Sequence, residues 1–89
     1  MASLVTAIET EGGWSCEVTL DQRRYQVAVS RAELDRYGAG GGVEDLVRRS
    51  FDFLLQRERP DQILARFRLS EIERYFPEYP QEIRRARPG

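Results

Sequence analysis

The chain has no histidine, no lysine and no asparagine, and it has one cysteine. All 14 basic residues are therefore arginines. Without histidine, no side chain has an ordinary pKa near neutrality, so the usual residue for general acid–base catalysis is missing. Without lysine, the Lys-Ser or Lys-Thr pair of a phosphate-binding P-loop cannot form. These absences count against the commonest kinds of enzyme site.

The presence of a single cysteine, Cys16, also bears on the cellular compartment in which the protein is expected. Small secreted domains usually carry paired cysteines, so we expect a reducing, cytoplasmic environment. Cys16 has no histidine to activate it and lies in an alternating apolar run, which predicts an inert core thiol. Residues 1–5 lack the pattern of a signal peptide, and no run approaches the roughly 18 apolar residues of a membrane span. We therefore expect no membrane contact.

Composition and charge are those of a small globular protein. The 89 residues are 40% apolar and 33% charged, and we expect one domain over residues 1–89. The net charge is −1, but residues 1–45 carry eight acids and four arginines (−4), and residues 46–89 carry seven acids and ten arginines (+3). This asymmetry can orient a partner or a homodimer, but it falls short of the basic excess typical of nucleic-acid-binding proteins.

Alternating apolar residues predict a three-stranded antiparallel meander over about residues 3–30. A three-residue first loop at 11–13 would pair Ile8 with Cys16 and Leu4 with Leu20, whereas a two-residue loop at 12–13 would mix apolar and polar side chains on each face. A second turn with its tip at 22–23 would put six apolar side chains on one face of the sheet: Cys16, Val18, Leu20, Tyr25, Val27 and Val29.

Helical signals follow the meander. Ser30 and Glu33 form a capping-box pattern that predicts a short helix over 31–37, followed by a glycine-rich loop over 38–42. A main helix is predicted over 43–59, where Pro60 ends it.

The remaining residues, 60–87, are predicted to form a C-terminal helical segment. It contains a short helix around Ile63, Leu64 and Phe67, and another that begins with a capping box of Ser70 and Glu73. The predicted fold class is thus α+β, with the meander followed by one long and two or three short helices packed on one face of the sheet.

The main helix has an apolar arc of roughly 200°, wider than packing on one sheet requires. Phe53 and Leu55 widen it, and the opposite polar stripe consists of Asp45, Arg48, Arg49, Asp52 and Gln56. The second side of this helix should therefore be covered by the C-terminal segment or by another subunit.

Five apolar residues are candidates for a protein interface, because aromatic side chains are enriched at interface centres. They are Phe53, Leu55, Tyr75, Phe76 and Tyr79. The alternative, which the sequence leaves open, is that they close the core of a small domain. The expected partner is another protein or a second copy of the chain.

No other motif predicts chemistry. The glycine-rich loop is followed by Glu44 and Asp45, whose charges would repel a phosphate at the start of the helix. Glu9, Glu11 and Glu17 are better explained as solvated surface acids than as a metal site. We therefore predict no catalytic, cofactor-binding or metal-binding residues, and a protein that is not an enzyme.

Residues 23–58 read as a strand, a short helix, a glycine turn and a long helix, and this order resembles the ribbon–helix–helix regulators. The resemblance implies DNA binding in the major groove, with Arg24, Gln26 and Ala28 facing the bases. The alternative nucleic-acid residues are thus Arg23, Arg24 and Gln26. The chain as a whole resembles small bacterial α+β proteins of antitoxin or adaptor type, which implies a regulatory, protein-binding function.

Overall fold

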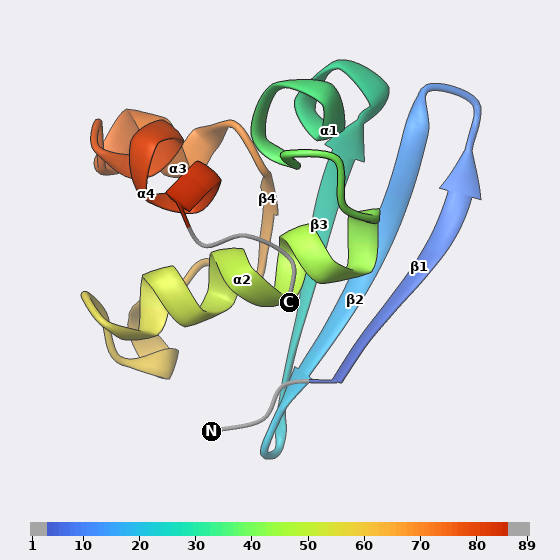
Figure 1. The fold of residues 1–89 in the computed structure, drawn as a ribbon. Helices are drawn as coiled ribbons and strands as arrows, with labels where there is room; N and C mark the ends of the chain where they lie inside the picture. Colours follow the sequence, from blue (N-terminus) through green and yellow to red (C-terminus); the bar gives the residue numbers. More distant parts are fainter. Residues whose placement is uncertain (1–3, 86–89) are drawn as a thin grey trace.

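The computed structural model describes residues 4–85, which form one sheet with helices packed on one side of it (Figure 1). The elements are β1 (Leu4–Thr10), β2 (Gly13–Leu20), β3 (Arg23–Ser30), α1 (Arg31–Tyr37), α2 (Val43–Leu55), a 3-10 turn (Pro60–Gln62), β4 (Arg66–Arg68), α3 (Glu71–Tyr75) and α4 (Tyr79–Arg85). The α+β class and the antiparallel meander are as predicted. The ends of the predicted meander and C-terminal segment, at residue 3 and at residues 86–87, lie outside the described residues.

The short strand β4 is an element that the sequence does not predict. The sheet order is β1-β2-β3-β4, and β4 runs parallel to β3 with Phe67 opposite Val27. The N–H of Gln26 donates to the carbonyl of Ala65 (2.7 Å), and the N–H of Leu69 donates to that of Ala28 (3.0 Å). The predicted short helix at this place is wrong, because a three-residue strand is too short to show a period of its own.

The first hairpin has a tighter loop than predicted. Its loop consists of residues 11–12, with Thr10 opposite Gly13. Gly13 belongs to the strand and not to the loop. A Cβ at Gly13 would lie 2.1 Å from the carbonyl oxygen of Val29, so only glycine allows β3 to approach here.

This register decides which side chains of β1 face the core. Val5 and Ala7 turn inward, whereas Leu4 and Ile8 turn outward and are 68% and 66% exposed. The prediction that Leu4 and Ile8 pair with core residues is therefore wrong. The pairing differs by one residue from the predicted one, and a shift of one residue exchanges the two faces of a strand.

The second hairpin keeps the predicted faces with a different register. Leu20 pairs with Arg23, so the tip is at residues 21–22 and not at 22–23. A shift of two positions in the pairing leaves every side chain on its original face. The predicted apolar row is confirmed, because all of its members are buried: Cys16, Val18, Leu20, Tyr25, Val27 and Val29.

The predicted helix α1 and its capping box are confirmed. The N–H of Glu33 donates to Ser30 Oγ (3.0 Å), and the N–H of Ser30 donates to Glu33 Oε1 (2.7 Å). Helix α2 begins at Val43 as predicted but ends at Leu55, four residues early. Arg59 is extended, with φ −80° and ψ 155°, the conformation that residues before proline prefer.

The second predicted capping box does not form. The Ser70 side chain makes no capping hydrogen bond in α3. The carboxylate of Glu73 instead accepts a hydrogen bond from the Tyr37 hydroxyl at 2.6 Å, and so joins α3 to α1. A long-range partner has replaced the local one.

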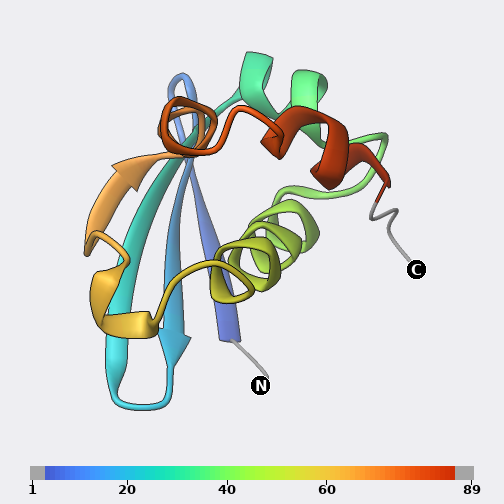
Figure 2. The same ribbon diagram turned by 90° about the vertical axis from the view of Figure 1, so that its left-hand side faces the viewer.

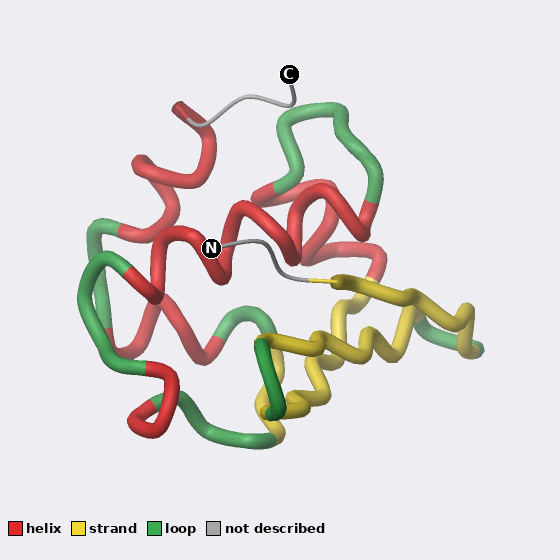
Figure 3. Tube along the Cα trace, turned by 90° about the horizontal axis from the view of Figure 1, so that it is seen from below, coloured by secondary structure: helices red, strands yellow, loops and turns green. Residues whose placement is uncertain are grey.

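Helix α2 lies across the inner face of the sheet, and no α-helix of residues 4–85 covers the opposite face (Figure 2). The helical and strand layers are separate when the molecule is seen from below (Figure 3). The second side of α2 was predicted to be covered either by the C-terminal segment or by another subunit, and the C-terminal segment covers it. Phe53 meets the rings of Phe76 (5.8 Å between centroids) and Tyr79 (5.2 Å).

No helix within residues 4–85 is long and apolar enough to cross a membrane.

The prediction that Arg49 lies in the exposed polar stripe of the main helix is wrong, because Arg49 is only 9% exposed. Its guanidinium donates to the carbonyl oxygens of Ile83 (2.8 Å) and Gly38 (3.2 Å) and to the carboxylate of Asp45 (2.8 Å). Arg49 thus ties α2 to α4 and to the end of α1. The sequence places it among solvated residues because its partners are carbonyl groups distant along the chain.

Candidate functional site

The five residues predicted as a protein interface occupy different environments. Phe53 and Tyr79 are buried, at 6% and 0% exposure, and belong to the core. Leu55 and Phe76 are half-buried and pack against it. Only Tyr75 presents most of its side chain to solvent, with 66% exposed. Of this set, the surface that another molecule can reach is therefore centred on Tyr75.

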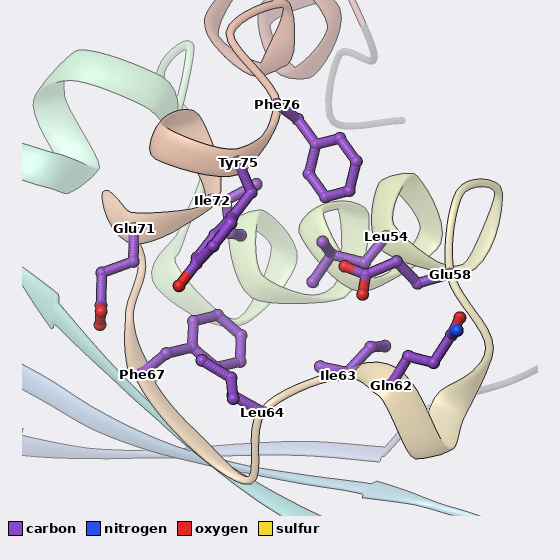
Figure 4. A pocket seen from close by; sticks show the side chains of 10 residues that line it. All are labelled: Leu54, Glu58, Gln62, Ile63, Leu64, Phe67, Glu71, Ile72, Tyr75 and Phe76. Carbon is purple, nitrogen blue, oxygen red and sulfur yellow. The ribbon is translucent and has the colours of Figure 1, made fainter.

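Tyr75 borders an apolar groove of about 380 Å³, called the α3 groove below (Figure 4). Its floor consists of buried or half-buried side chains from α2, β4 and α3, and Leu64 stands across from Tyr75 with 52% of its side chain exposed. The lining residues are Leu54, Glu58, Gln62, Ile63, Leu64, Phe67, Glu71, Ile72, Tyr75 and Phe76.

The groove exists because the chain reverses after α2. Pro60 begins the 3-10 turn, and the chain then returns to pair with β3. In β4, alternation points Phe67 toward the core, where its ring lies 6.1 Å from that of Phe51. Helix α3 follows directly and presents Ile72 inward and Tyr75 outward. Three segments that are separate along the chain therefore enclose one apolar depression.

The lining of the α3 groove carries negative charge and no positive charge. Glu58 and Glu71 line it, whereas none of its lining residues is an arginine. The carboxylate of Glu71 accepts a hydrogen bond from the N–H of Arg68 at 2.6 Å. Glu58 is half-buried, and its carboxylate has no hydrogen bond or ion pair with any described residue. A bound cation or N–H donor would supply the missing partner.

The buried ionisable groups hold their protons near neutral pH. Burial, reinforced by the charge of Glu44, raises the pKa of Cys16 to about 11. Burial and a hydrogen bond to Glu73 raise the pKa of Tyr37 to about 12. Neither Cys16 nor Tyr37 is therefore ionised near neutral pH. Within residues 4–85, no three acidic or cysteine side chains gather as a metal site would require.

The alternative nucleic-acid residues lie on or beside the open face of the sheet. Arg24 and Gln26 are exposed there, and Arg23 is exposed at the end of the β2–β3 turn. The parallel strand β4 adds Arg66 and Arg68 beside them, two residues that the sequence alone did not predict for this site. In the sequence, the only local sign of a strand here is that Arg66 and Arg68 alternate with Phe67. Strand β3 pairs with β2 along its whole length on one side, and with β4 over residues 26–28 on the other, so the middle of its backbone has no free edge for a second copy.

Comparison with known proteins gives the chain no relative: no family model matches it, and neither a curated protein nor a solved structure is detectably similar to it.

Proposed function

We propose that the protein is a non-enzymatic protein-binding module that holds a short segment of a partner protein in the α3 groove. One observation carries the proposal. Leu64 and Tyr75, two of the four large apolar side chains that are exposed within residues 4–85, stand together at a depression whose floor is already apolar. Apolar depressions edged by exposed side chains are typical of sites that receive an anchoring side chain.

The charge of the groove specifies the partner further. An apolar anchor such as leucine or phenylalanine would fill the floor over Phe67 and Ile72. A neighbouring arginine or lysine of the partner would pair with Glu58, whose carboxylate has no other partner among the described residues. The ligand is therefore a segment in which apolar and basic residues adjoin. A regulatory subunit such as an antitoxin would hold its target in this way.

The test uses two synthetic peptides. One combines leucine and phenylalanine with arginine, and the other has glutamate in place of each arginine. We expect the basic peptide to shift the amide NMR signals of residues that line the groove, among them Leu64, Phe67 and Tyr75. The acidic peptide should bind more weakly, because Glu58 and Glu71 repel it.

Matched variants locate the binding surface. Tyr75→Ala should weaken the basic peptide about tenfold or more, the effect of losing one anchor contact. Ile8→Ala is the control, since Ile8 is equally exposed but lies on the opposite face of the sheet. Equal binding of both peptides, or signal shifts away from the groove, would reject the proposal. Self-association that Tyr75→Ala abolishes would instead make a second copy the occupant.

A further inference from the structure

The open face of the sheet carries a line of three arginines, Arg24, Arg66 and Arg68, called the arginine row below. Gln26 pairs with Arg66 and Ala28 with Arg68, so the side chains of β4 on either side of Phe67 share the face of Gln26. Arg24 lies two residues before Gln26 on β3 and therefore projects from the same face. All three arginines are exposed.

The row has regular spacing. Arg66 and Arg68 are alternate residues of one strand, which places their Cα atoms about 7 Å apart. Arg24 and Arg66 are diagonal neighbours on adjacent strands, a separation of about 7–8 Å. A shallow depression of about 300 Å³ adjoins the row. Ser15 and Gln26 line it with neutral hydrogen-bonding groups, and Glu71, the first residue of α3, also lines it.

The charges of the row are available to a ligand. None of the three guanidinium groups makes a hydrogen bond or an ion pair with any other described residue. The nearest acids do not pair with the row. Glu71 accepts the backbone N–H of Arg68, and Glu17, a diagonal neighbour of Arg24 at about 7–8 Å, makes no ion pair with it. Guanidinium groups suit phosphate oxygens, which they bind through paired N–H donors.

The surroundings of the row favour nucleic acid over protein. A protein interface needs an apolar centre, and the only apolar side chain of β3 and β4 on this face is that of Ala28. The exposed Leu4 and Ile8 of the same face lie on β1, at the far edge of the sheet. Interfaces with nucleic acids are more polar and more positively charged. A single strand has a flexible backbone and can follow the row across β3 and β4.

We propose that the arginine row binds the phosphate backbone of single-stranded nucleic acid. Each guanidinium contacts one phosphate. Contacts to phosphates carry no sequence information, so binding does not depend on base sequence. The arginine row and the floor of the α3 groove lie on opposite sides of β4, because Phe67 alternates with Arg66 and Arg68, and Glu71 borders both the groove and the depression beside the row.

The experiment measures the fluorescence anisotropy of labelled oligothymidine and oligouridine over a range of salt concentrations. Three phosphate contacts to a single strand predict a slope of log K against log salt of about −2. Replacing two of them, in Arg66→Ala with Arg68→Ala, should bring the slope to about −0.7. At about 0.1 M salt the affinity should then fall by about 20-fold or more, since each lost contact removes about fivefold.

The control variant combines Arg48→Ala with Arg74→Ala. It removes the same two charges from exposed arginines of α2 and α3 that make no ion pair with other described residues. Its binding should stay within about twofold of the unchanged protein. Equal losses in both double variants would mean a nonspecific charge effect and would overturn the proposal. Tighter binding to a duplex of the same length would also overturn it, as would displacement by polyglutamate at equal charge.

Discussion

The backbone N–H of Ala7, on the free edge of β1, donates a hydrogen bond to the carboxylate of Glu44 at 3.2 Å. The other edge strand has the same arrangement, because the N–H of Arg68 donates to Glu71 at 2.6 Å. Unpaired groups of an edge strand can pair with another chain, and a charged side chain over them hinders that pairing. At each edge of this sheet, a glutamate carboxylate therefore occupies a backbone N–H that could otherwise pair with another chain.

Replacing Glu44 with alanine should increase self-association through β1. The Ala7 N–H would lose its partner, and the exposed Leu4 and Ile8 of the same strand would favour contact with a second copy. Sedimentation equilibrium would measure the association constant. Asp52→Ala is the control, because Asp52 is an exposed acid of the same helix without a partner among the described residues. Equal association of the two variants would show that Glu44 does not guard the edge.

Arg49→Met should lower the free energy of unfolding by about 2–4 kcal/mol, because the buried carbonyl oxygens of Ile83 and Gly38 would lose their donor. Arg48→Met, at the neighbouring exposed position, should change it by no more than about 0.5 kcal/mol. Urea unfolding of both variants measures the difference. Similar values would mean that Arg49 does not hold α4 against α2.

Stability should fall in acid partly through Glu33. Burial alone would raise the pKa of Glu33, but hydrogen bonds from Ser30 and Ser70 outweigh it and hold this pKa below its ordinary value. The unfolded chain therefore binds the proton more tightly. The stabilisation from Glu33 is complete above the ordinary glutamate pKa and is lost as the pH falls through the lower, folded value.

Glu33→Gln isolates this contribution. The variant should be less stable by about 1.5–3 kcal/mol near neutral pH, the loss expected for hydrogen bonds to a charged group. Its stability should also fall less steeply in acid than that of the unchanged protein. Urea unfolding at several pH values would show this. Parallel curves for the two proteins would mean that Glu33 titrates alike in the folded and unfolded chains.

Gly13→Ala should destabilise the protein by about 3 kcal/mol, because the added Cβ would lie 2.1 Å from the backbone oxygen of Val29 and force β2 and β3 apart. Gly12→Ala is the matched control, since a Cβ there meets nothing within 4 Å. Its effect should stay within about 0.5 kcal/mol. Thermal unfolding of both variants tests the comparison. A small effect at Gly13 would contradict the close approach of the strands.

The structure confirms several predictions that rest on residues close together in the sequence. Between Cys16 and Val29, the apolar residues of each strand fall in one alternating set, so alternation predicts which face is buried. The two-residue difference in pairing between β2 and β3 does not change that face. The capping box of Ser30 and Glu33 spans three residues and forms as predicted. The prediction fails in β1, where both alternating sets contain apolar residues. There the pattern favours neither face, and the two-residue loop at 11–12, with Thr10 opposite Gly13, sets the register.

By itself, the sequence determined the α+β class, the meander and the helix starts at Arg31 and Val43, because turns, caps and alternation act between close neighbours. The tertiary structure decided the rest. Strand β4, the burial of Arg49 and the α3 groove depend on contacts between segments far apart along the chain. Such contacts leave no period in the local sequence, so only the folded chain brings Leu64 to Tyr75 and Arg66 beside Arg24.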